Sequence, residues 1–264
     1  MSLMLHAGSQ EATMQDVLDT PTPPNTDTHF PIPHARLIGA VRRNVERSGW
    51  QVQDAEFGLW DAKDVPGAQM FGIMTLNPKL PDGIVSIDDL APSDHGLVVG
   101  IRNSHNKLFS ASMAIGSRVF VCDNLAFSGE ITIARKHTRF ILRDLDRLVA
   151  QAVGKISALR VTQELRIESY RTYELDDAQV HDLLIRSVDA KVMANSYIPK
   201  VLDEWREPSH EEFEARTAWS LFNGFTEVFK QTNPLDLSQR TTRLHGLMDM
   251  VTGALVDDID TRGL

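Results

Sequence analysis

Four short apolar segments between residues 96 and 135 constrain the fold of this chain more than any other feature. Each is rich in residues such as Val, Ile or Phe, which favour strands, and polar turn-forming residues separate them. The predicted strands cover residues 96–103, 107–115, 118–122 and 130–135. A parallel crossover needs roughly a dozen residues, so a connection as short as Gly116 and Ser117 joins only antiparallel neighbours. The sequence therefore predicts an antiparallel meander sheet.

Apolar repeats at helical spacing on both sides of this sheet predict an α+β fold. One repeat predicts an N-terminal helix over residues 34–48, and weaker strand signals follow it at residues 51–60, 68–76 and 84–87. After the sheet, an apolar stripe runs from Ile141 to Leu159, with Thr138 as a plausible N-cap. This stripe predicts one long helix over residues 138–167 that packs on the sheet.

The C-terminal region is predicted to be helical. Three repeats predict helices at residues 177–194, 210–231 and 237–256. Ser209 followed by Glu212 has the spacing of a capping box at the start of the second one. We therefore divide the chain into a flexible N-terminal arm (1–29), an α+β core domain (30–170), a helical C-terminal region (171–256) and a tail (257–264).

Composition narrows the cellular setting. No apolar run approaches the roughly 18 residues that cross a bilayer, and the first thirty residues lack the pattern of a secretory signal. The only cysteine is Cys122, which excludes an intramolecular disulfide and a four-cysteine zinc site. We expect a cytoplasmic protein without membrane contact, in which Cys122 is buried and inert.

Charge is distributed unevenly along the chain. The formal net charge is −9, yet residues 96–160 carry ten Lys and Arg side chains against four Asp and Glu. A basic segment within an acidic protein can create a local positive field. The basic residues lie in the predicted hairpins and on one face of the predicted long helix, which is typical of a stripe that neutralises successive phosphates.

Enzymatic motifs are sparse. The chain has no phosphate-binding loop, no dinucleotide fingerprint and no nucleophile elbow. Cys122, His105 and His137 could form a thiol–imidazole pair or, with Asp123, a metal site. We keep this as the alternative of a metal-dependent hydrolase or nuclease, and expect a non-enzymatic protein without metal or cofactor.

The candidate nucleic-acid site combines the basic residues with polar residues at a hairpin tip. Phe109, Phe120 and Phe127 are the nearby aromatic residues that could stack on bases. The predicted site residues are Arg102, Asn103, His105, Lys107, Arg135, Lys136, His137, Arg139 and Arg143.

The same region carries a family resemblance. The segments GIRNSHNK, VFVCDNLAFSG and RKHT, followed by a long helix and then TAWSLFNGFTEVF, resemble the phage/plasmid-like protein family called domain of unknown function 932. The similarity runs from about Pro33 to Phe229. The order of helix, antiparallel sheet with a basic hairpin and long helix is also similar to phage single-strand-annealing proteins, at the level of fold.

The resemblance and the basic segment together favour a DNA-binding protein of a mobile genetic element. We expect it to form homo-oligomers and to hold single-stranded DNA along the sheet and the long helix, with annealing or recombination as its role. A third alternative is a non-enzymatic phage protein that binds a protein partner through its acidic helical half.

Overall fold

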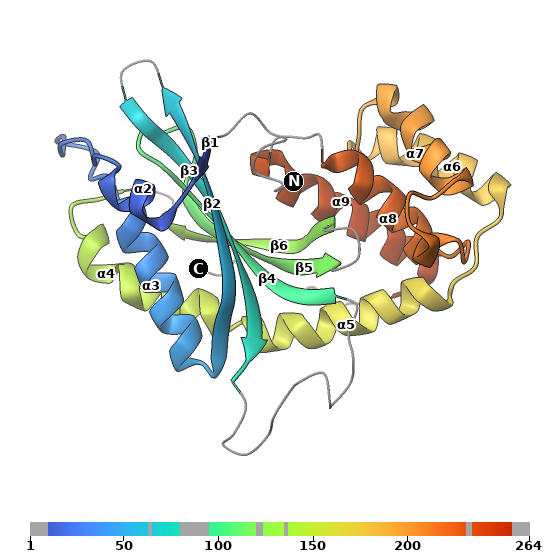
Figure 1. Cartoon of the computed structure of the whole chain (residues 1–264), viewed down its shortest axis with the longest axis horizontal. Helices are drawn as coiled ribbons and strands as arrows, with labels where there is room; N and C mark the ends of the chain where they lie inside the picture. The colour runs from blue at the N-terminus through green and yellow to red at the C-terminus, as the bar shows by residue number, and fades with distance from the viewer. Residues whose placement is uncertain are drawn as a thin grey trace.

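The computed structural model describes residues 10–62, 65–79, 95–119, 124–134, 137–230 and 234–254. Within these ranges the chain forms one sheet whose six strands follow in chain order, each antiparallel to its neighbour (Figure 1). The strands are β1 (Gln10–Ala12), β2 (Trp50–Ala62), β3 (Val65–Pro78), β4 (His95–Ser104), β5 (Ala111–Val119) and β6 (Asn124–Ala134). The predicted α+β class and the antiparallel meander are confirmed.

Helices cover both faces of the sheet. Helices α3 (His34–Arg47) and α4 (Ile141–Val153) pack on one face, and α5 (Ile156–Thr172), α8 (Ala218–Phe229) and α9 (Pro234–Thr252) pack on the other (Figure 1). Side chains of β3 point alternately to the two faces of the sheet and so contribute to both cores. Met70 and Met74 join the α3–α4 core, while Phe71 and Ile73 join the opposite core. A sheet buried on both faces explains why the strands read as continuous apolar runs.

The helices between α5 and α8 lie at the end of the molecule away from α3 and α4 (Figure 1). They are α6 (Asp177–Asp189) and α7 (Ile198–Arg206), with the short 3-10 helices η1 (Asn195–Tyr197) and η2 (Glu211–Phe213). Helix α7 contacts α8, whose side chains are buried along almost its whole length. Among the described residues, no helix is both long enough and apolar enough to cross a bilayer.

The N-terminal segment contains structure that the sequence did not predict. Within the arm expected to be flexible, β1 pairs with β2, and α2 (Met14–Asp19) follows with a capping box between Thr13 and Asp16. Val17 of α2 is buried. These elements are too short to show a period, so only their packing on the rest of the protein reveals them.

Two expected boundaries in and after the sheet are wrong. Strand β5 continues through Gly116 and Ser117, where the sequence suggested a turn, and residues 107–110 precede the strand. Gly116 lies at a register shift between β5 and β6, and glycine commonly marks such a bulge in a strand. The expected short strand at 118–122 lies partly in β5, and Cys122 and the segment 84–87 fall outside the described residues.

The long helix is also interrupted. Helix α4 ends at Val153 with Gly154 as its capping residue, and α5 starts at Ile156. Ile156 still belongs to the core under α3, whereas Ile167 and Tyr170 belong to the opposite core. The chain therefore passes from one face of the sheet to the other along α5, after the break.

In the C-terminal region, one helix was not predicted and another begins later than expected. Helix α7 was not predicted, and α8 begins at Ala218, with Thr217 rather than Ser209 as its capping residue. Thr217 accepts a hydrogen bond from the backbone N–H of Ser220 at 3.3 Å. The Ser209 hydroxyl instead donates to a carboxylate oxygen of Glu204 at 2.7 Å.

Candidate functional site

The structure divides the predicted site residues into separate groups. Arg139 and Arg143 lie exposed at the start of α4, and Lys107 is exposed in the turn after β4. Three others, Asn103, His105 and His137, are at most 5% exposed and therefore do not lie on the surface where the prediction placed them. Arg135 and Lys136 fall outside the described residues.

Arg102 lies on the other face of the sheet from Asn103, because successive strand residues point to opposite sides. Its Nε donates to the Oγ of Ser112 at 2.8 Å, and its guanidinium carbon lies 5.3 Å from the centroid of the Phe109 ring. Of the other aromatic candidates, Phe120 and the side chain of Phe127 fall outside what the structure describes. The predicted groove along the hairpin and the long helix is therefore not a single surface.

Exposed arginines gather instead on helices α3 and α4. We call the outer surface of these two helices the basic layer. It contains three carboxylates, those of Glu46, Asp144 and Asp146. Its exposed basic side chains are Arg36, Arg42, Arg43, Arg47, Arg139, Arg143 and Arg147. This excess of positive charge lies on an acidic protein, so the layer is a local positive surface.

Some of these arginines hold the two helices together. Arg43 of α3 pairs with Asp146 of α4 at 2.9 Å, and Arg36 donates from Nη2 to the carbonyl oxygen of Leu142 at 2.7 Å. Contacts between exposed groups such as Arg43 and Asp146 contribute little to stability. They place Arg36 and Arg43 of α3 against α4.

An aromatic side chain lies within the basic layer. Phe140 is 44% exposed, and the guanidinium carbons of Arg139 and Arg143 lie 4.5 and 4.7 Å from its ring centroid. Exposed aromatic rings and guanidinium planes are the groups on which proteins stack the bases of single strands. Phe140 was not among the site residues predicted from the sequence, although its position off the apolar stripe of α4 was a signal of exposure.

At the start of α3, four histidines form a cluster in which three rings are buried and His29 is half-buried. The rings of His34 and His105 stack with centroids 3.8 Å apart, and those of His29 and His137 stack at 5.0 Å. The Nε2 of His34 donates to the carbonyl oxygen of Gly67 at 2.8 Å, and the Nε2 of His105 donates to that of Ile32 at 2.9 Å. Carbonyl oxygens only accept, so in the neutral rings each Nδ1 carries a lone pair.

Burial keeps these rings neutral. Desolvation, with the neighbouring histidine rings, lowers the pKa of His34 to about 3 and that of His137 to about 4. Desolvation is also the main cause that lowers the pKa of His105 and of His29. His105 and His137 are thus buried, uncharged groups at neutral pH rather than contacts for phosphates.

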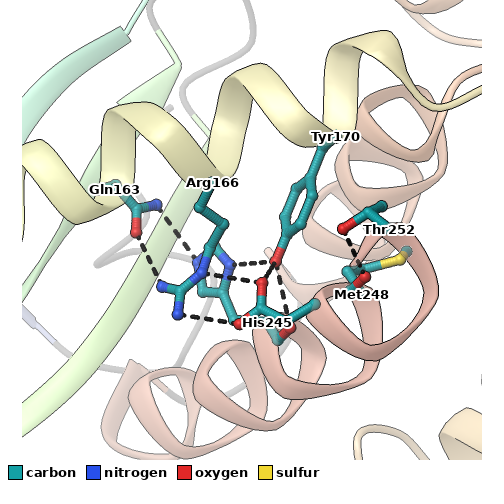
Figure 2. A network of polar contacts seen from close by, with 7 residues as sticks. Gln163, Arg166, Tyr170, His245, Met248 and Thr252 are labelled. Carbon is teal, nitrogen blue, oxygen red and sulfur yellow. Dashed lines mark hydrogen bonds and ion pairs between the residues drawn. The ribbon is translucent and has the colours of Figure 1, made fainter. Parts of the chain in front are cut away.

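A second buried polar network joins α5 to α9 (Figure 2). The guanidinium of Arg166 binds both carboxylate oxygens of Asp249 at 3.0 Å, and Tyr170 donates to the same carboxylate at 2.5 Å. Gln163 extends the network to the sheet by donating to Ser117 of β5 at 3.3 Å. Burial raises the pKa of Tyr170, helped by Asp249, and desolvation holds the pKa of His245 well below its usual value.

The network in Figure 2 is suited to a structural role. Its side chains point from one helix to the other and satisfy one another, and Tyr170 and His245 are fully or almost fully buried. A neutral phenol and a neutral imidazole in such a place fix the distance between two helices. No pattern in the sequence indicated it, because its residues come from helices about 80 positions apart.

Comparisons with models of protein families, with curated proteins and with solved structures find no match for this chain. The site is therefore defined by its geometry. Its parts are an arginine-rich helical layer around an exposed aromatic ring and a cluster of four histidines at the start of α3.

Proposed function

We propose that the protein is a DNA-binding protein of a mobile genetic element that holds single-stranded DNA along the basic layer. The observation that carries the proposal is the position of Phe140 between Arg139 and Arg143 on a surface with seven exposed arginines. Arginines along two aligned helices neutralise successive phosphates, and the aromatic ring offers a stacking platform to a base.

The position of this surface modifies the expectation from sequence. The strand would run over α3 and α4 rather than over the hairpin tip, because Asn103, His105 and His137 are buried. Arg139 and Arg143 keep their predicted role, and the arginines of α3 join them. Homo-oligomers on DNA, annealing and recombination remain part of the proposal through the resemblance to phage annealing proteins.

The hydrolase alternative finds less support. It requires His105 and His137 at an accessible site, whereas both are buried and uncharged. No group of three or more metal-binding side chains could hold an ion among the residues that the structure describes. Asp123 lies outside those residues.

Fluorescence anisotropy with a labelled oligothymidylate over a salt series tests the proposal. Replacing Arg139 and Arg143 by Gln removes two phosphate contacts, so the slope of log affinity against log salt should become shallower by about 1.4. The matched control replaces Arg186 and Arg206, two exposed arginines of α6 and α7, and should leave affinity and slope unchanged.

Phe140→Ala gives the second arm of the test. Loss of base stacking should weaken binding by roughly fivefold or more without a change in the salt slope, because no charge is removed. The basic layer would be rejected as the site if the Arg139 and Arg143 variant and the Arg186 and Arg206 control lost equal affinity for the oligonucleotide. It would also be rejected if the wild type did not bind at low salt. The partner-binding alternative would then lead.

A further inference from the structure

Buried polar atoms without a partner concentrate in one place in the described part of the chain. They are Nε2 of His29, Oδ1 of Asn103, Nδ1 of His105 and both ring nitrogens of His137. Proteins normally pair buried polar atoms, so a cluster of unpaired ones indicates a site with a role beyond packing. His29 belongs to the segment that leads into α3, and the other three residues contact this segment.

This segment, residues 29–33, is the strap. Its backbone is held by histidines and their neighbours: the N–H of Phe30 donates to the carbonyl oxygen of His137 at 2.8 Å, and the carbonyl oxygen of Ile32 accepts from Asn103 at 2.7 Å and from His105 at 2.9 Å. Ile32 itself is completely buried. The side chains that hold the strap on the sheet are those of His105 and Asn103. His105 can take up a proton, and Asn103 contacts His34, which can also take one up.

The charges around the cluster disfavour protonation. Each ring repels its neighbours when charged, and Lys107 adds positive charge near His29. On the α3 side the nearest charged side chain in sequence is Arg36, which donates to the carbonyl oxygen of Leu142. On the β2 side Asp61 accepts the N–H of Gly67, whose carbonyl oxygen binds His34.

A proton on His34 would also break a specific contact. The Nδ1 of His34 lies 2.9 Å from the Nδ2 of Asn103 and accepts a hydrogen bond from it while the ring is neutral. A protonated Nδ1 is a donor, and two donors facing each other repel. Asn103 is one of the two residues that donate to the carbonyl oxygen of Ile32, so the effect reaches the strap directly.

We propose that His29, His34, His105 and His137 form an acid-sensitive latch, which holds the strap on the sheet while the rings are neutral and releases it when they take up protons. The latch acts at the entry to α3, which supplies four of the seven arginines of the basic layer. The proposal does not depend on nucleic-acid binding, because it concerns the opening of the strap in the protein alone.

Hydrogen–deuterium exchange with mass spectrometry of the full chain at pH 7.5 and 5.5 tests the latch. After correction for the intrinsic rates, protection of peptides containing Phe30, and of those containing His105, should fall. The expected fall is about tenfold per pH unit below 6.5 for each ring that takes up a proton on opening. At pH 5.5 these peptides should exchange faster than those from α8, which opens only on global unfolding.

His137→Phe separates titration from packing. The ring nitrogens of His137 have no partner to lose, and a phenyl ring can keep the stack on His29. The variant should remain protected at pH 7.5 and should lose about tenfold less protection at pH 5.5. His29→Gln serves the same purpose if His137→Phe does not fold, and His181→Gln on the exposed surface of α6 is the control that should behave as wild type.

Any of three results would overturn the latch. One is unchanged protection of the strap between the two pH values. Another is equal protection of strap and α8 peptides at pH 5.5, which would mean that acid unfolds the whole protein at once. The third is a fall in strap protection at pH 5.5 that neither His137→Phe nor His29→Gln reduces. Such a result would assign the effect to groups outside the cluster.

Discussion

The imidazole rings of His34 and His105 lie face to face, with their planes 7° from parallel. His34 is the first residue of α3 and His105 follows the last residue of β4, so this contact joins the helix to the sheet. Each ring donates one proton to a backbone carbonyl and presents a lone pair on its other nitrogen. The stacked pair is stable in its neutral form, and its energetics therefore depend on pH.

Global stability should fall with acid. The folded pKa of His34 is lowered to about 3 from its usual value near 6.5, so the unfolded chain binds more protons between these values. The contribution of His34 is complete above about pH 6.5 and decreases as the pH falls toward 3. Urea unfolding at pH 7.5 and at pH 5.0 should show a loss of about 2 kcal/mol from this ring alone. A His34→Gln variant should show a smaller loss, and equal losses in both proteins would contradict the prediction.

The ion pair between α5 and α9 should behave as a buried pair. The side chains of Arg166 and Asp249 are only 9% and 17% exposed. Asp249→Ala leaves Arg166 without its carboxylate partner and removes the acceptor of the Tyr170 hydroxyl. We expect a loss of about 3 kcal/mol in the free energy of unfolding. Asp182→Ala, which breaks an exposed pair with Arg186, should cost under about 1 kcal/mol. Similar losses in thermal or urea unfolding would show that the network does not hold the helices.

Replacing Gly67 and Gly246 by alanine should change the stability of the protein in opposite directions. Gly67 has a φ of +58°, and a Cβ there would lie 2.7 Å from Thr20, so Gly67→Ala should destabilise the protein by more than about 1 kcal/mol. Gly246 is in helix α9, and a Cβ there would meet nothing within 4 Å. Gly246→Ala should therefore stabilise by about 0.5–1 kcal/mol. Calorimetry of the two variants compares them directly, and a stabilising Gly67→Ala would be inconsistent with the positive φ of this residue.

The capping residue of α8 can be checked in the same way. Thr217→Ala removes the acceptor for the N–H of Ser220 and should cost about 1 kcal/mol. Ser209→Ala, at the position that the sequence favoured, removes only an exposed contact with Glu204 and should change stability by less than about 0.5 kcal/mol. The reverse order of effects would restore Ser209 as the helix start.

Local patterns in the sequence were sufficient for most of the secondary structure. The spacing of Leu37, Ile38, Val41 and Val45 predicted α3 because one face of that helix is buried. The short connections predicted the antiparallel order correctly, since chain geometry excludes a parallel crossover in so few residues. Exposure of Arg139 and Arg143 also followed from their places outside the apolar stripe.

Tertiary structure decided the rest. Whether Gly116 marks a turn or a bulge depends on the strands beside it, and the core to which each part of α5 belongs depends on the layers packed on the two faces of the sheet. The burial of His105 and His137 depends on the strap that crosses them, and polar residues in a turn look the same in sequence whether solvent or protein covers them. The sequence by itself thus determined the antiparallel order of the sheet and the approximate positions of most of the long helices. The contacts between residues far apart in the chain determined which side chains are buried, paired or left on the surface, because burial is a property of the assembled layers.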